Sequence, residues 1–217
     1  MFELHQANIA YGEQVALRNI SLHIKAGEHV ALIGPSGAGK TTLLKTLYDQ
    51  YPQDASFVHQ HYALVPQLSA FHNVYMGRLD RYSTWQNLHN LVWPRRDTKA
   101  EIVPLLDELG LASFAFKRVG ALSGGQQQRT AIARAMYRAS KVMFADEPVA
   151  SVDPHQAGMV LDLIMKSQQT VILSLHAVEL ALEFAQRIIG LRHGAIAFDL
   201  PASEVSSSHL TQLYQPC

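Results

Sequence analysis

Apolar and polar residues alternate at residues 20–24, Ile-Ser-Leu-His-Ile, with the period of a half-buried strand. The uninterrupted apolar run at 29–33 predicts a strand that is buried on both faces. A glycine-rich loop follows this run, and the next residues predict a helix at about 40–48. Similar apolar runs predict further buried strands at 142–145 and 170–175. The pattern is that of strands separated by loops and helices.

The middle of the chain, residues 71–111, is polar and rich in helix-forming residues, and we expect Pro94 and Pro104 to break it into pieces. Helices are also expected at about 126–139, 154–166 and 177–185, and a short antiparallel pair of strands at about 188–198. Strands that alternate with helices predict an α/β fold, with a mostly parallel central sheet, antiparallel strands at its margin and a helical lobe.

Composition limits the class of function. The 217 residues carry 18 basic and 18 acidic side chains, so the chain lacks the basic surplus of a protein that grips nucleic acid. Cys217 is the only cysteine, which excludes an intramolecular disulfide and favours a reducing compartment. The N-terminus shows no signal-peptide pattern, and no apolar run approaches the roughly 18–20 residues that span a bilayer. We therefore expect a protein that works in the cytosol.

Residues 34–41, Gly-Pro-Ser-Gly-Ala-Gly-Lys-Thr, match the phosphate-binding pattern G-x-x-x-x-G-K-[ST]. Glycines let successive backbone N–H groups point at phosphate oxygens, and the helix that follows adds its positive dipole end. Lys40 is expected to reach the β- and γ-phosphates of ATP, and the Thr41 hydroxyl to bind Mg²⁺. The candidate nucleotide-binding residues here are Gly34, Pro35, Ser36, Gly37, Ala38, Gly39, Lys40, Thr41 and Thr42. The alternative is a simple glycine-rich turn between a strand and a helix.

Two acids, Asp146 and Glu147, follow the apolar run at 142–145. A strand end delivers them to the carboxyl edge of the sheet, beside the phosphate loop. Asp146 is expected to hold Mg²⁺, and Glu147 to polarise the attacking water as a general base. On their own, the two acids could equally be surface residues.

A second candidate phosphate site begins at Leu122-Ser123-Gly124-Gly125-Gln126. Ser123 can cap a helix whose N-terminus favours an anion. The segment resembles the signature motif of the ABC-type ATPases. In that family the signature of one subunit contacts the γ-phosphate bound by its partner. The resemblance therefore implies nucleotide contacts from Ser123, Gly124, Gly125 and Gln126, and a head-to-tail dimer of two copies around two ATP molecules.

The remaining motifs of the family also occur in order. Tyr11 resembles the aromatic residue that stacks on adenine, and Gln67 resembles the glutamine that touches Mg²⁺ and the attacking water. Residues 151–153, ending in Asp153, resemble the loop that crosses the dimer interface, and His176 resembles the histidine that bonds the γ-phosphate. The alternatives are an ordinary strand or turn tyrosine, a solvent-facing loop glutamine and a structural histidine.

The resemblance covers nearly the whole chain and implies one ABC ATPase domain, that is a P-loop NTPase. Residues 1–66 and 140–217 are expected to form its nucleotide-binding lobe, and residues 67–139 its helical lobe with the signature motif. Only 26 residues separate Lys40 from Gln67, fewer than is usual in the family, so we expect a trimmed edge to the nucleotide-binding lobe. The short remainder after Phe198 leads us to expect no regulatory domain.

Several longer stretches, at 73–79, 114–122, 147–154, 174–182 and 187–194, resemble the phosphonate-importer ATPases in particular. The resemblance implies an ATPase that powers import of a phosphonate or related phosphorus compound from the cytoplasmic face of the membrane. Its implied partners are membrane permease subunits and a periplasmic or extracellular substrate-binding protein. Two alternatives stay open: an importer ATPase for another small solute, and a soluble ABC ATPase of DNA repair or translation. A P-loop kinase or small GTPase would leave the signature motif unexplained.

Overall fold

The computed structural model describes residues 1–12 and 14–215, without the side chains of Tyr11 and Gln14. Its strands are β1 (Phe2–Tyr11), β2 (Gln14–Ile24), β3 (His29–Ile33), β4 (Ala55–Val58), β5 (Val142–Asp146), β6 (Thr170–Ser174), β7 (Arg187–Arg192) and β8 (Ala195–Pro201). Its α-helices are α1 (Lys40–Tyr48), α2 (Ala70–Tyr75), α3 (Thr84–Val92), α4 (Arg96–Glu108), α5 (Gly124–Arg138), α6 (Pro154–Ser167), α7 (Val178–Phe184) and α8 (Ser207–Tyr214). Within these described residues, every helix is too short or too polar to cross a membrane.

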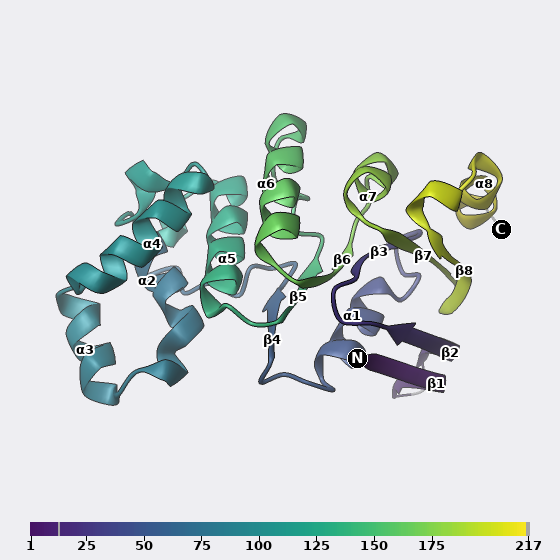
Figure 1. Cartoon of the computed structure of the whole chain (residues 1–217), viewed down its shortest axis with the longest axis horizontal. Coiled ribbons are helices and arrows are strands. Elements are labelled where there is room, and N and C mark those ends of the chain that lie inside the picture. Colours follow the sequence, from purple (N-terminus) through teal and green to yellow (C-terminus); the bar gives the residue numbers. More distant parts are fainter. Residues whose placement is uncertain (13, 216–217) are drawn as a thin grey trace.

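The main sheet has the strand order β4-β5-β6-β3-β7-β8. Its first five strands are parallel, and β8 pairs antiparallel with β7. The separate pair β1-β2 is antiparallel. The mostly parallel sheet with antiparallel strands at its margin is therefore confirmed. Figure 1 shows the strands running across the centre, with α6 and α7 on one side and α1 with β1-β2 on the other.

Alternating side chains of the central strands fill two cores. On β3, Val30 and Leu32 pack with α1 and the β1-β2 pair, whereas Ala31 and Ile33 pack on the face of α5 to α7. Both faces of a parallel sheet are covered, so the residues of its strands are apolar at every position. Successive side chains along a strand point alternately into the two cores. This is why the run at 29–33 predicts its strand correctly.

The helices α2, α3 and α4 gather at the end of the molecule beyond β4, and α5 joins them to the sheet (Figure 1). Pro94 lies between α3 and α4, as expected. Pro104, however, lies inside α4, so the expectation of a break there is wrong. Proline in a helix removes one backbone hydrogen bond, and here the tertiary packing of Ile102 and Leu106 in the core holds the helix together on either side of it.

The segment between α1 and α2 contains one short strand, the four-residue β4, which pairs with β5. The sequence pattern did not predict this strand, because Ala-Ser-Phe-Val is too short to show a period. Its side chains at Ala55, Ser56 and Val58 are buried, so its stability comes from the long-range pairing with β5.

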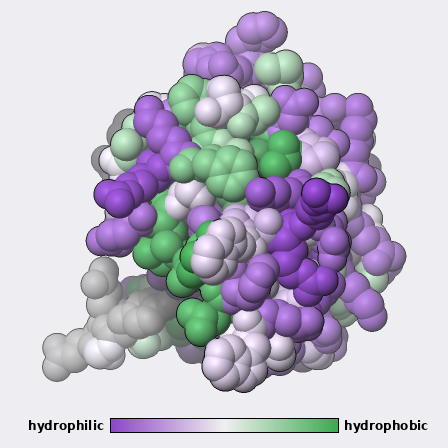
Figure 2. Space-filling view, turned by 90° about the vertical axis from the view of Figure 1, so that its left-hand side faces the viewer, coloured by the Kyte–Doolittle hydropathy of each residue, from purple (hydrophilic) through white to green (hydrophobic). Residues whose placement is uncertain are grey.

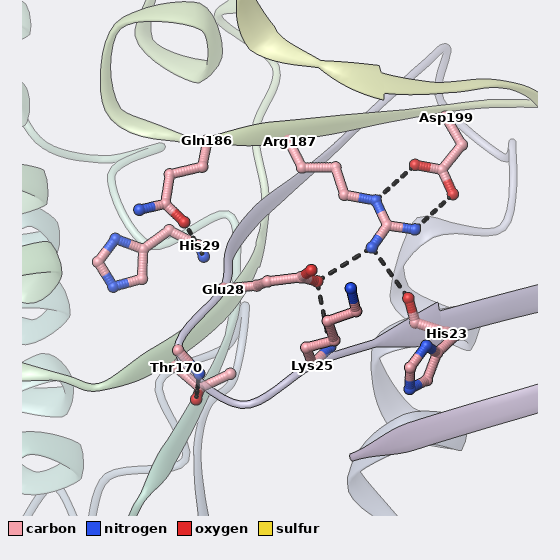
Figure 3. A network of polar contacts seen from close by, with 9 residues as sticks. His23, Lys25, Glu28, His29, Thr170, Gln186, Arg187 and Asp199 are labelled. Atoms are coloured by element: carbon pink, nitrogen blue, oxygen red, sulfur yellow. Dashed lines mark hydrogen bonds and ion pairs between the residues drawn. The ribbon is translucent and has the colours of Figure 1, made fainter.

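Arg187, the first residue of β7, connects four parts of the fold at the amino-terminal edge of the sheet (Figure 3). Its guanidinium donates to both carboxylate oxygens of Asp199 on β8, at 2.6 and 2.7 Å. It also donates to the carboxylate of Glu28, before β3, at 3.0 Å, and to the carbonyl of His23 on β2 at 2.9 Å. The hydrogen bonds to Asp199 raise the pKa of Arg187, while its partial burial acts the other way. This network lies at the opposite edge of the sheet from the phosphate loop.

Candidate active site

Four neighbouring strands end at the same edge of the sheet. β4, β5, β6 and β3 are adjacent and parallel, and their registers align Val58 with Ala145, Asp146 with Ser174, and Ser174 with Leu32. The residues that follow each strand therefore meet at one place, as ligand-binding loops do in open α/β sheets. They are Gln60 after β4, Glu147 after β5, His176 after β6 and the loop from Gly34 after β3.

These residues line a cavity of about 670 Å³. The volume is in the range of small-molecule sites, which is roughly 300–1,000 Å³. Its lining consists of Val15, Ala16, Arg18, Ser36, Gly37, Ala38, Gly39, Lys40, Thr41, Thr42, Gln60, Glu147, His176, His193 and Gly194. The phosphate loop and the start of α1 form its floor, so the cavity fits a nucleoside triphosphate.

The backbone of the phosphate loop requires glycine. Gly34 has a φ of 146°, and a Cβ atom there would lie 2.1 Å from the carbonyl oxygen of Leu191. Gly39, the residue before α1, has a φ of 103°, and its Cβ would lie 2.6 Å from the Leu17 side chain. The loop thus takes a path that side chains would block, as a backbone that wraps closely around a phosphate requires.

Lys40 is buried, with 6% of its surface exposed, although it carries a charge. Its ammonium donates to the carbonyl oxygens of Gly34 at 2.7 Å and Pro35 at 3.1 Å. Burial lowers the pKa of Lys40, and the negative charges of Glu147 and Asp146 oppose this shift. The ammonium is therefore held over the loop by partners that a phosphate can replace.

A set of oxygen donors surrounds Asp146. Its carboxylate accepts a hydrogen bond from the Thr41 hydroxyl at 2.8 Å and another from the Ser174 hydroxyl at 2.7 Å. Asp146 is 3% exposed. Hydroxyl and carboxylate oxygens are the ligands that Mg²⁺ prefers, so Thr41 and Asp146 fit a magnesium ion. Ser174, which the sequence analysis did not name, orients Asp146.

Glu147 has a left-handed backbone, with a φ of 52°, which for a residue with a side chain costs on the order of 1–3 kcal/mol. The Ser174 hydroxyl accepts a hydrogen bond from the Glu147 N–H at 2.9 Å. The carboxylate of Glu147 lies 2.5 Å from Nε2 of His176, measured from Oε1. These contacts turn the side chain back toward the phosphate loop instead of letting it continue the line of β5.

Gln60 lies where the sequence analysis expects Gln67. Its amide donates to Oε2 of Glu147 at 3.4 Å, and it lines the cavity, whereas Gln67 is exposed and lines no part of it. The structure therefore places Gln60, and not Gln67, beside Glu147 in the cavity, and the contact of Gln67 with the magnesium ion and the attacking water stays a prediction. Tyr62 and Ala63 have left-handed backbones, with φ of 60° and 47°, and this turn carries the chain away from the end of β4 before Gln67. Gln60 could have been found in the sequence from its position just after a strand, but only if β4 had been predicted.

The signature residues lie outside this cavity. Ser123 caps α5 with a capping box to Gln126, as the sequence predicts. The start of α5 packs on the loop after β5: a Cβ atom on Gly125 would lie 2.8 Å from the Ser151 carbonyl oxygen. Asp153 caps α6 by accepting from the Gln156 N–H at 3.0 Å. One chain thus carries two separate candidate phosphate sites.

Strand β2 contributes residues to the cavity that the sequence analysis missed. Val15, Ala16 and Arg18 line the cavity, and no local motif distinguishes them. Tyr11 ends β1, and the position of its side chain lies outside the described part of the structure. Its stacking on adenine therefore stays a prediction.

Comparison with known proteins shows to which family the chain belongs. The family described as ABC transporter matches residues 17–150, which is more than half of the chain. The chain belongs to the ABC transporter family. The sequence resemblance is thereby confirmed, and the chain is an ATP-binding ATPase of the ABC type.

Among curated relatives of this ABC ATPase, the phosphonates import ATP-binding protein PhnC 2 of Pseudomonas aeruginosa is 41% identical over 93% of the chain and 85% of the relative. PhnC of Maricaulis maris is 37% identical over 96% of the chain and 90% of the relative. PhnC of Anaeromyxobacter dehalogenans is 40% identical over 98% of the chain, which spans about half (48%) of that longer relative.

Solved structures agree on the fold. The ABC ATPase superimposes with a TM-score of 0.79 on a dimeric post-hydrolysis state of the ATP-binding cassette MJ0796 bound to ADP and Pi. That cassette is 27% identical, and the match covers 93% of this chain and 99% of that one. A metal-chelate type ABC transporter in an inward-facing conformation matches with a TM-score of 0.81 at 24% identity, which supports the fold alone.

Proposed function

We propose that the chain is the ATP-hydrolysing subunit of an ABC importer for phosphonates or a related phosphorus compound. The observation that carries the proposal is the meeting of four adjacent strand ends in one cavity, with the phosphate loop, Glu147, His176 and Gln60 around it. The cargo is inferred from relatives that are named phosphonate import proteins and that align with nearly the whole chain.

In this proposal the phosphate loop and Lys40 bind the β- and γ-phosphates of ATP. Glu147 takes a proton from the attacking water as general base, and His176 orients the Glu147 carboxylate and bonds the γ-phosphate. Thr41 and Asp146 would hold Mg²⁺, which neutralises charge on the phosphate oxygens when it is bound. Gln60 joins the water to the segment that leads into the helical lobe.

A second copy of the chain completes each site. The Ser123–Gln126 segment lies outside the cavity of its own subunit, so in the proposed dimer it contacts the γ-phosphate held by the partner. A two-fold arrangement satisfies both sites at once, because the same pair of surfaces meets twice. The dimeric cassette to which the chain is similar supports this arrangement.

The helical lobe, which we assign to residues 67–139, is the proposed contact with the permease. An apolar groove of about 380 Å³ lies between α2 and α3 and is lined by Leu68, His72, Tyr75, Met76, Leu79, Thr84, Asn87, Leu88 and Leu91. Hydrophobic side chains gather at the surface on the side of the molecule that Figure 2 faces. A groove of this kind suits an amphipathic helix of a membrane subunit, which would hold the chain at the cytoplasmic face of the membrane. A substrate-binding protein on the other side would deliver the phosphonate.

The decisive experiment removes the general base and leaves the residues that bind ATP in place. Glu147→Gln should bind ATP, lose hydrolysis and accumulate as an ATP-bound dimer, which size-exclusion chromatography with light scattering detects. Hydrolysis at the native rate by this variant would refute the assignment of Glu147. The cargo is tested separately: a strain that lacks the gene should grow on phosphate and fail on methylphosphonate as the sole phosphorus source.

A further inference from the structure

Gln128 is a buried polar residue in the second turn of α5, with 2% of its surface exposed. Its amide nitrogen donates to the carbonyl oxygen of Glu147 at 2.7 Å. Its amide oxygen accepts from the N–H of Ser151 at 2.8 Å. The Gln128 side chain is therefore hydrogen-bonded to both ends of the turn from Glu147 to Ser151, which leads from the proposed base to the proposed interface loop.

An amide is suited to this place because it carries a donor and an acceptor on the same planar group. The turn itself is stabilised by a weaker bond, from the Ala150 N–H to the Glu147 carbonyl at 3.2 Å. On the other side of the Glu147 backbone, Ser174 accepts from its N–H. Gln128 and Ser174 thus hold the two peptide groups that flank the left-handed Glu147 residue.

The same turn is fixed against the signature end of α5. Gly125 lies so close to the Ser151 carbonyl that a Cβ atom would be 2.8 Å from it. The Tyr62 hydroxyl donates to the Ser151 hydroxyl at 2.7 Å. A displacement of α5 must therefore displace the 147–151 turn with it.

We propose that Gln128 is a positioning residue that transmits the position of the signature helix to Glu147 of the same subunit. This inference rests on the proposed dimer, in which residues 123–126 contact the partner's ATP while Glu147 acts on the subunit's own ATP. Binding of nucleotide in one site would then align the base of the other, so the two sites hydrolyse cooperatively.

Gln128→Met tests the link, because it preserves length and apolar packing and removes both hydrogen bonds. We expect kcat to fall about tenfold to a hundredfold, as for a misplaced catalytic group. The KM for ATP should stay within about twofold, because the phosphate loop is untouched, and the Hill coefficient should fall toward unity. Thr130→Val is the matched control: it removes a buried hydroxyl of α5 that donates to the Gln126 carbonyl and does not touch the turn.

Gln128→Glu gives a readout that a purely structural role would not produce. The carboxylate keeps the acceptor for Ser151 and loses the donor for Glu147, and protonation restores that donor. Burial raises the pKa of such a carboxyl, so kcat relative to wild type should recover several-fold between about pH 8.5 and about pH 6.

An unchanged kcat in a folded Gln128→Met protein, or a pH-independent kcat ratio for Gln128→Glu, would overturn the inference. If Gln128→Met does not fold, the pH series on Gln128→Glu decides alone. Absence of ATPase activity in the wild-type protein would instead contradict the proposed function, so the two failures are distinguishable.

Discussion

The imidazole Nε2 of His176 lies 2.5 Å from the carboxylate Oε1 of Glu147. Their strands, β6 and β5, are adjacent and parallel, so the two side chains emerge from the same edge of the sheet one strand apart. His176 is half exposed to the cavity, whereas the Glu147 side chain is 14% exposed. On the side of the phosphate loop, the Glu147 carboxylate is therefore mostly buried and the His176 imidazole is accessible.

Replacing His176 by alanine should lower kcat by about 10²-fold, because the variant loses both the contact that orients Glu147 and the proposed contact to the γ-phosphate. Binding of ATP, measured with a fluorescent analogue, should change little. His89→Ala, at an exposed position of α3, is the control and should keep native kcat. A native turnover number in His176→Ala would show that the contact with Glu147 is not used.

Gln60 and Gln67 form a natural comparison, since both are glutamines on the segment between α1 and α2. Gln60→Ala should reduce kcat about tenfold by removing the amide beside Glu147, while Gln67→Ala should stay within about twofold. Steady-state ATPase assays on both variants measure this difference. The reverse ranking would restore Gln67 as the site residue.

Leu88→Asp should weaken permease binding about tenfold or more, because it places a charge in the apolar groove. Leu88 is 53% exposed, so the free chain should tolerate the change. The two tryptophans of the chain, Trp85 in α3 and Trp93 directly after it, are 81% and 70% exposed, and their fluorescence should shift to the blue if permease covers this helix. Met159→Asp, at an exposed apolar residue of α6, should bind permease normally; equal loss in both variants would contradict the assignment of the groove.

Arg187→Met should lower the free energy of unfolding by about 1–3 kcal/mol, because it leaves the carboxylates of Asp199 and Glu28 without their partner. Urea titration measures the loss. Arg187→Lys should recover only part of it, since an ammonium cannot make the two-pronged contact with Asp199. The kcat of the folded fraction should remain native in both, because the network lies at the edge of the sheet opposite the phosphate loop; a stability equal to wild type in Arg187→Met would refute the role.

The residues that the sequence places at the edge of the sheet and that the structure finds there are those set by local order. The phosphate loop follows directly on β3, and Asp146 and Glu147 end or follow β5. His176 follows β6 in the same way. A buried apolar run shows where a parallel strand ends. A motif that follows such a run therefore lies at the carboxyl edge of the sheet.

Gln60 could not be separated from Gln67 by the same reasoning. β4 is four residues long and is defined by its pairing with β5, 87 residues later in the chain (Ala55 with Val142), and the left-handed turn at Tyr62 and Ala63 carries Gln67 away. Pro104 within α4 is a similar case, because packing on both sides overrides its local preference.

The sequence by itself determined the α/β class, the phosphate loop, the acid pair and the signature, since each depends on residues that are close along the chain. Tertiary structure alone decided which glutamine stands beside Glu147 and which buried amide holds its turn. Gln128 bridges Glu147 and Ser151 only because α5 packs on the loop after β5. Such contacts depend on the distance between elements, which local patterns do not encode.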